Sequence, residues 1–430
     1  MKTFLILLTA LLAQTQTKPA KATYQQLNSA LGLALWSSDN LWNNQAAVVA
    51  QRLKLPQESK TSYDSSYRLY PQTSANVMGE HAYSLSLDGD ASGNITDLSI
   101  IFANLGDAKD LAQNSPNVTT VASLANGKMS NAQQAQMVTA VRNAIQAESA
   151  NITKQLTALL GKFTYFSYGS DQKTAEVVQR WDWNGHAILL ASEKDKYLAL
   201  RIVPTAMADR KNVKMTNWDA FSKQLGQRVA HRDNGDVVIQ DLPMVNQGPK
   251  GYCVPATWCR ALRYMGIPAD LYQIALADST GVGGGTSFAQ SARAVDSMVH
   301  AYGYHLVNHG GTMQLANFTD KIDRGLPVMW GMFVVDQLNS DLSDRMADRG
   351  VFAAPDGLEA YNKVLQPARF AAPQIRTDRN NAHMCLIIGY NKKSNELAIS
   401  DSWGPNFAER WITVEEAQAI SQGQFLEISW

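Results

Sequence analysis

The chain has 430 residues, and its 38 Lys and Arg residues balance 38 Asp and Glu residues. A net charge of zero gives no electrostatic case for nucleic acid or an anionic membrane surface as the partner. Hydrophobic residues make up 45% and charged residues 18%, which excludes extensive disorder, and three cysteines cannot form a disulfide scaffold. The length predicts two or three folded domains.

The first 22 residues have the features of a cleavable signal peptide. Lys2 supplies the positive charge, residues 4–13 are apolar, and Ala20-Lys21-Ala22 is a cleavage motif of small residues. The apolar run is too short to span a bilayer, and no later run has the length and apolar character of a transmembrane helix. We expect cleavage after Ala22 and a secreted or periplasmic protein; a buried N-terminal helix is the alternative.

Residues 23–205 predict one α+β domain. A helical spacing of apolar residues occurs twice, and strand-like segments follow each time. The expected helices are 41–53 and 132–160, and the expected strands are 82–87, 95–102, 177–183, 187–191 and 197–203. The repeated order suggests an internal duplication with both sets of strands in one antiparallel sheet, although coincidence explains it equally well. His81 and His186 are isolated and are interpreted as structural or surface histidines.

A connection and then a second domain follow. Residues 206–236 are charged and polar, with a helix expected over 218–225, and a short strand at 237–239 opens the domain 237–430. Residues 337–380 are polar and are interpreted as an insertion between strands. His300, His305 and His309 have a metal-like spacing, but no cysteine or carboxylate pattern completes a site, so we expect no metal.

The most informative segment is a glycine-rich loop, 246–252, that leads into an apolar helical pattern with Cys253 at the junction. The first turn of a helix carries unpaired N–H groups and partial positive charge, which favour a thiolate and can receive an oxyanion. Gln247, six residues earlier, could be a second oxyanion donor. An inert buried cysteine is the alternative.

A proton acceptor for such a cysteine lies in the last fifty residues. His383 lies near the start of an apolar strand-like run, 382–390, and a polar turn at 391–395 separates this run from the run 396–404, so the two should pair as a hairpin. Asp401 lies eighteen residues after His383. In a hairpin, the start of one strand lies beside the end of the next, so Asp401 can orient the imidazole and stabilise its cation.

These blocks resemble the papain-like cysteine peptidase superfamily over residues 237–430, just under half of the chain. An asparagine usually stands where this chain has Asp401. Aspartate is typical of a bacterial branch resembling the peptidases that remove double-glycine leader peptides. The matching motifs are Asn246-Gln247-Gly248, Gly251, Tyr252-Cys253-Val254-Pro255-Ala256-Thr257, Gly285-Thr286-Ser287, Arg324-Gly325-Leu326-Pro327-Val328, Ala382-His383, Gly389-Tyr390, Asp401-Ser402-Trp403-Gly404 and Trp411-Ile412.

The resemblance implies a helix carrying the nucleophile packed on an antiparallel sheet, and a peptide or protein substrate cleaved without a cofactor. The implied roles are nucleophile for Cys253, acid and base for His383, orienting group for Asp401 and oxyanion donor for Gln247. Substrate would be bound by Gly284 and Gly285 of the glycine-rich run 281–286, and by Trp403, which could also shield the histidine.

Several alternatives stay open. The same residues could act on isopeptide or other amide bonds or transfer the acyl group, or the chain could be a non-catalytic binding protein on this scaffold. Papain-type enzymes follow the nucleophile with Trp where this chain has Val254, and they carry disulfides, whereas Cys259 and Cys385 are expected to be free core thiols. Because pro-segments of the superfamily are usually smaller and helical, we expect the first domain to be a permanent accessory domain and not a pro-segment.

Overall fold

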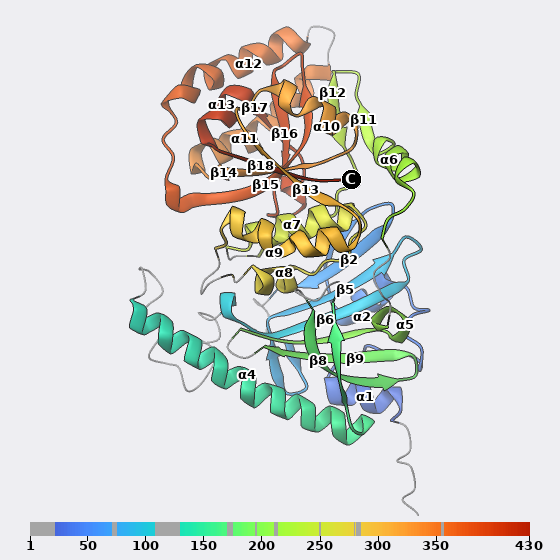
Figure 1. The fold of residues 1–430 in the computed structure, drawn as a ribbon. Helices are drawn as coiled ribbons and strands as arrows, with labels where there is room; N and C mark the ends of the chain where they lie inside the picture. Colours follow the sequence, from blue (N-terminus) through green and yellow to red (C-terminus); the bar gives the residue numbers. More distant parts are fainter. Residues whose placement is uncertain are drawn as a thin grey trace, which may run out of the picture.

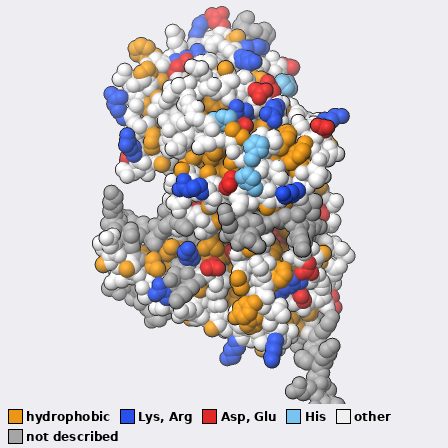
Figure 2. All heavy atoms as spheres, in the orientation of Figure 1, with side chains coloured by type: hydrophobic (Ala, Val, Ile, Leu, Met, Phe, Trp, Pro, Cys, Tyr) orange, Lys and Arg blue, Asp and Glu red, His pale blue; other side chains and the backbone are white. Residues whose placement is uncertain are grey.

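A computed structural model describes residues 22–70, 75–107, 130–169, 175–193, 196–209, 214–248, 251–278, 280, 285–353 and 357–430. The described chain forms two antiparallel sheets, one in each half, with helices between and around them (Figure 1). The expected signal peptide lies outside the described residues, apart from Ala22. Described side chains of both charge signs are mixed over the face drawn in Figure 2.

The N-terminal sheet has eight strands in the order β1-β2-β5-β6-β10-β9-β8-β7. This order is mirrored about the central β6–β10 pair, and the proposed duplication stays a prediction because a shared topology needs no shared ancestry. The strands are β1 (Gln57–Lys60), β2 (Asp64–Leu69), β5 (Ser84–Asp90), β6 (Ile95–Asn104), β7 (Thr164–Tyr168), β8 (Glu176–Trp183), β9 (His186–Glu193) and β10 (Tyr197–Pro204), beside a separate ribbon of β3 (Ala75–Val77) and β4 (Glu80–Ala82).

Helices α1 (Tyr24–Leu31), α2 (Ala46–Leu53) and α4 (Asn131–Leu160) pack with this sheet around one hydrophobic core. The helix expected over 41–53 begins only at Ala46, because Gln45 forms a β-bridge with Asn94 and the N–H of Ala46 donates to Gly93. The alternation over 82–87 predicted one buried face, yet Ser84 to Leu87 are all buried. Both faces of the sheet are therefore covered at β5.

The C-terminal sheet runs β11-β12-β15-β14-β18-β13, and β16 and β17 extend it beside β15. Its strands are β11 (Val229–His231), β12 (Asp236–Ile239), β13 (His305–Gly310), β14 (Val328–Phe333), β15 (Ala382–Asn391), β16 (Glu396–Ser400), β17 (Arg410–Thr413) and β18 (Ser421–Ser429). Two helices, α11 (Asp336–Asp348) and α12 (Gly357–Ala371), form the insertion between β14 and β15. Helix and antiparallel sheet together confirm the α+β class.

Helix α7 (Cys253–Tyr264) is the buried centre of the C-terminal half, and it lies with α8 (Leu271–Ala277) and α9 (Phe288–Ala301) between the two sheets (Figure 1). The Thr257 hydroxyl donates to the carbonyl of Met384 at 2.9 Å, which ties α7 to β15. Pro255 is tolerated because it lies in the first helical turn. The shorter helices are α5 (Thr205–Ala208) and α6 (Trp218–Gly226) in the connection, then α10 (Thr319–Asp323) and α13 (Val414–Ile420).

The isolated histidine His186 is structural, as expected. Its Nε2 accepts hydrogen bonds from the Trp36 indole and from the N–H of Leu41, and its side chain is fully buried. Within the described residues, no helix combines the length and apolar character needed to cross a membrane.

Candidate active site

Cys253 is the first residue of α7, where a helix has N–H groups without intrahelical partners. Tyr252 occupies the N-cap position, but its hydroxyl donates to Asn104 and does not cap the helix. Burial raises the pKa of the Cys253 thiol, but a hydrogen bond from His383 and the charge of that imidazole outweigh it. Backbone N–H groups of Met384 and Val254 act in the same direction, so the net pKa is lowered.

His383 and Asp401 meet at one end of the β15–β16 hairpin. His383 is the second residue of β15, and Asp401 directly follows β16. The expected contact between them is present, since His383 Nε2 lies 2.9 Å from Asp401 Oδ1. Because Nε2 faces the carboxylate, Nδ1 is the ring nitrogen that remains for Cys253. The pair is closed to solvent, with His383 5% exposed and Asp401 0% exposed.

The environment of His383 favours its cation. Burial alone would lower the pKa of the imidazole, but hydrogen bonds with Asp401 and Cys253 raise it to about 9. For Asp401, burial raises the pKa. The hydrogen bond and charge of His383, followed by those of Arg410, outweigh burial and lower the pKa below its usual value. With the pKa of Cys253 lowered and that of His383 raised, the arrangement can hold a thiolate beside an imidazolium at neutral pH.

Arg410 and Arg260 fix the end of β16 and Asp401, which follows it, and the sequence analysis missed both. Arg410, on β17, donates to Asp401 Oδ2 at 2.5 Å. Arg260, on α7, donates to the Ser400 hydroxyl at 2.5 Å and to its carbonyl at 3.1 Å, which joins the helix of Cys253 to the strand before Asp401. Burial lowers the pKa of Arg260 to about 10. A buried arginine in an apolar helix was the available signal, because such a charge needs partners.

Gln247 is joined to the residue after Asp401. Its N–H donates to the carbonyl of Ser402 at 2.8 Å, and the Ser402 hydroxyl donates to its Oε1 at 2.8 Å. With Oε1 occupied as an acceptor, the amide is oriented by the same segment that carries Asp401, and Nε2 is its donor. Hydrogen bonds thus connect Gln247 to Ser402 and His383 to Asp401, and His383 lowers the pKa of Cys253.

The expected substrate-binding residues are only partly described. The ring of Trp403 stacks on the imidazole of His383, with centroids 4.5 Å apart and planes at 28°. This contact fits the expected shielding of the histidine. The N–H of Gly285 donates to the carbonyl of Gly251 at 2.9 Å, so the end of the glycine-rich run lies close to the segment before Cys253. Gly284 lies outside the described residues.

The structure describes the three histidines with a metal-like spacing and all three cysteines. His300 lies 3.4 Å from Asp296, and His309 lies 3.5 Å from Glu427. No group of three or more potential metal ligands occurs among the described residues. Cys253, Cys259 and Cys385 are all buried and free. Burial raises the pKa of Cys259 to about 12 and raises that of Cys385 well above its usual value.

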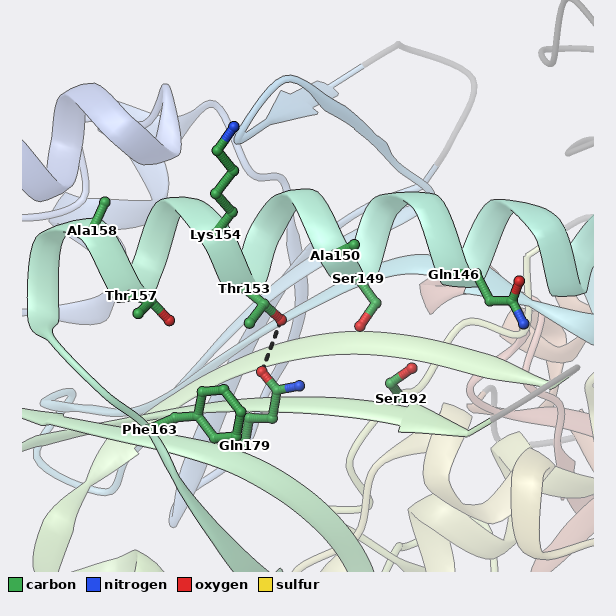
Figure 3. Close-up of a pocket in the computed structure, with 10 residues that line it drawn as sticks. All are labelled: Gln146, Ser149, Ala150, Thr153, Lys154, Thr157, Ala158, Phe163, Gln179 and Ser192. Atoms are coloured by element: carbon green, nitrogen blue, oxygen red, sulfur yellow. Dashed lines mark hydrogen bonds between the residues drawn. The ribbon is translucent and has the colours of Figure 1, made fainter.

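A separate groove of about 840 Å³ runs along α4 and is unrelated to these residues (Figure 3). Thr153 and Gln179 cross it with a hydrogen bond of 2.8 Å. Its described lining contains no cysteine, histidine or carboxylate: Gln146, Ser149, Ala150, Thr153, Lys154, Thr157, Ala158, Phe163, Gln179 and Ser192. It therefore lacks a nucleophile with an adjacent base.

The comparison with protein families agrees with this geometry. Residues 239–430 match the model of the Peptidase_C39 like family. Xylellain, a cysteine protease from Xylella fastidiosa, is a similar solved structure, with 10% identity and a TM-score of 0.30 over 48% of this chain and 88% of that one. The search of curated proteins gives no match. Residues 239–430 are therefore a cysteine-type peptidase domain of the papain-like superfamily.

Proposed function

We propose that the chain is an exported cysteine peptidase that hydrolyses peptide bonds through Cys253, His383 and Asp401. The observation that carries this proposal is the grouping of three side chains: Cys253 at the start of a buried helix, His383, which lowers the pKa of Cys253, and Asp401, 2.9 Å from His383 Nε2. A nucleophile, a base and a group that orients the base are the parts required for covalent acyl transfer.

Acylation uses the thiolate of Cys253 and the imidazolium of His383. The Cys253 thiolate attacks the substrate carbonyl carbon, and the resulting oxyanion is received by the Cys253 backbone N–H and by Gln247 Nε2. The His383 imidazolium then gives its proton to the leaving amine as the C–N bond breaks, which leaves an acyl thioester on Cys253. Each oxyanion donor is worth about 3 kcal/mol in comparable sites.

Deacylation uses the same groups in the opposite direction. Neutral His383 takes a proton from water, the resulting hydroxide attacks the thioester carbonyl, and Cys253 leaves as a thiolate beside the restored imidazolium. Asp401 keeps the ring in one orientation and stabilises its cation in both steps. Trp403, stacked on the ring, covers one face of His383 and limits the access of water to the ion pair.

A labelling experiment tests the proposal. The chain is treated with a thiol-directed peptide electrophile, the modified residue is mapped by mass spectrometry, and hydrolysis of a peptide library is followed in parallel. Cys253→Ala should abolish labelling and lower hydrolysis by more than about a thousandfold, whereas Cys259→Ala is the matched control for loss of a thiol. Hydrolysis that persists in Cys253→Ala would refute the assignment. Products joined to an added amine would identify an acyl transferase.

Export is tested separately by sequencing the amino terminus of the mature protein. We expect it to begin at Thr23. The hydroxyl of Thr23 accepts from the N–H of Gln26, and Gln26 Oε1 accepts from the Thr23 nitrogen, so a chain that begins there keeps the cap of α1. A mature chain that still carries residues 1–22 would contradict the export proposal.

A further inference from the structure

The N-terminal domain contacts the segment that leads to Cys253 through β1, β6 and Tyr70, the residue after β2. The residues concerned are 246–248 and 251–252, here called the anchored loop, which stand on either side of residues 249 and 250, outside the described chain. This loop begins one residue before Gln247 and ends one residue before Cys253. Its position therefore decides where an oxyanion donor and the nucleophile lie relative to one another.

The first anchor holds Asn246 by both of its backbone groups. Its N–H donates to Glu58 Oε1 at 2.9 Å, and its carbonyl accepts from the Tyr70 hydroxyl. Glu58 is itself fixed, because Arg68 Nε donates to its two oxygens at 3.1 and 3.0 Å in a buried ion pair. The next residue, Gln247, is bonded on its other side to Ser402. The oxyanion glutamine thus lies between an anchor in the N-terminal domain and the strand of Asp401.

The second anchor holds Tyr252, the residue before Cys253. Its hydroxyl donates to Asn104 Oδ1 at 2.9 Å, and the N–H of Gly106 donates to the same oxygen at 2.7 Å. The fit is close, since a Cβ atom on Gly106 would lie 2.0 Å from the Tyr252 hydroxyl oxygen. Both Asn104 and Tyr252 are buried. The residue at the N-cap position of α7 is therefore held by a residue of the other domain.

The interface between the two domains around the anchored loop is packed like the interior of a protein. One hydrophobic cluster contains Leu189 and Tyr197 of the N-terminal sheet together with Tyr252 and Trp258 of the C-terminal domain. Arg263, on α7, lies 3.0 Å from Asp88 and 3.6 Å from Asp64. Separation of the domains would expose this apolar surface and leave a largely buried cation without its partners, which is unfavourable.

The contacts do not obstruct the chemistry. Hydrogen bonds between described residues link the N-terminal domain to six residues of the C-terminal part, and none of them reaches Cys253, His383 or Asp401; the six are Asp241, Met244, Asn246, Tyr252, Asp270 and Gln273. An inhibitory segment would be expected to cover the reacting groups. Here the domain holds the backbone that carries them.

We propose that the N-terminal domain is a built-in part of the peptidase, in which Glu58, Tyr70 and Asn104 are positioning residues for the two ends of the anchored loop. The catalytic role of the anchored loop rests on the proposed function. The dependence of the loop on the N-terminal domain does not rest on it.

Variants of the full chain test the two anchors. Tyr70→Phe removes the hydroxyl that holds Asn246, and Gly106→Ala forces Tyr252 to move. Tyr70→Phe should lower kcat roughly tenfold with KM nearly unchanged, because an oxyanion donor is displaced, and it should leave the pH profile of Cys253 alkylation unaltered. Gly106→Ala should lower kcat and also move that profile to higher pH, because the nucleophile itself is displaced.

Matched controls make the same two kinds of substitution at other positions. Tyr165→Phe deletes a hydroxyl from a side chain that is 73% exposed, and Gly226→Ala adds a methyl group where nothing lies within 4 Å. Both should behave as the wild type. If Gly106→Ala does not fold, Tyr252→Phe tests the same anchor by removing only the hydroxyl.

The outcomes separate the two proposals. Folded anchor variants with wild-type kcat and an unchanged alkylation profile would overturn the inference, and so would a rise in kcat, which would identify an inhibitory domain. If the wild type hydrolyses no peptide, the proposed function fails, and the alkylation profile of Gly106→Ala still decides the inference: a displaced profile supports it and an unchanged one overturns it.

Discussion

Arg410 donates a hydrogen bond of 2.5 Å to Oδ2 of Asp401, and His383 occupies Oδ1 of the same carboxylate at 2.9 Å. The carboxylate is therefore held from both sides and has one orientation. Arg410 is itself fixed by Asn339 of the insertion, whose Oδ1 accepts from it at 2.5 Å. A buried carboxylate with two charge-assisted partners stays ionised, which is what the imidazolium of His383 requires.

Replacing Arg410 with methionine should lower kcat roughly tenfold to a hundredfold, because Asp401 loses one of its two fixed contacts. Removal of a nearby cation should also raise the pKa of His383, since the charge of Asp401 is then less compensated. The alkaline limb of the kcat profile should therefore move to higher pH. A purely structural role for Arg410 would lower the stability and leave that limb in place.

The control for this variant is Arg232→Met. Arg232 also pairs with a carboxylate, Glu409, at 2.6 Å, but its side chain is 37% exposed and contacts none of the candidate catalytic residues. Its kcat profile should match that of the wild type. Equal effects of the two substitutions would contradict the positioning role of Arg410.

The proposed ion pair between Cys253 and His383 predicts a bell-shaped dependence of kcat/KM on pH. Activity should appear as the Cys253 thiol ionises, below the usual titration of a thiol because its pKa is lowered, and should disappear as His383 loses its proton near pH 9. Alkylation of Cys253 should accordingly persist in mildly acidic solution. His383→Ala should move the alkylation profile upward in pH, and an identical profile in that variant would exclude the pairing.

The three thiols should differ sharply in reactivity. Cys253 should be alkylated first, while Cys259 and Cys385 should resist alkylation until the protein is unfolded, because burial raises the pKa of both. Mass spectrometry after brief treatment under native conditions, and again in denaturant, measures this order. Labelling of Cys259 or Cys385 at the rate of Cys253 in the folded protein would count against the assignment of the nucleophile.

The sequence predicted those parts of the site that depend on local patterns. The turn at 391–395 and the two apolar runs beside it required a hairpin, and the hairpin brought Asp401 to His383. The junction of a glycine-rich loop with an apolar helix placed Cys253 at a helix start. The catalytic roles of these residues stay predictions until the variants are measured.

The remaining parts depend on contacts that no local pattern encodes. Asn104 lies 148 residues before Tyr252, and β1 and β2 contain polar segments such as Gln57–Lys60 that show no apolar alternation. The strand β13 is mostly exposed or half-buried, so its hydrophobic signal is weak. Over residues 337–380 the sequence showed only a polar composition and predicted an insertion. This insertion forms two helices and supports Arg410 through Asn339.

Asp278 supplies a test of stability that is independent of catalysis. It is the C-cap of α8 and is 1% exposed, and neither carboxylate oxygen has a hydrogen-bond partner within the described part of the chain. Burial raises its pKa from 3.8 to about 8. The folded protein therefore keeps this proton between about pH 4 and pH 8, where the unfolded chain releases it, so the free energy of unfolding should fall as the pH rises through that range.

Asp278→Asn removes this titration and should become more stable relative to the wild type as the pH rises. The difference between their free energies of unfolding should increase between pH 4 and pH 9 by a few kcal/mol, since each unit of pKa shift corresponds to about 1.4 kcal/mol. Urea unfolding at several pH values measures it. Asp344→Asn, which alters an exposed carboxylate on α11, should give a nearly constant difference. Parallel stability curves for wild type and Asp278→Asn would show that this carboxylate has a partner or is reached by water.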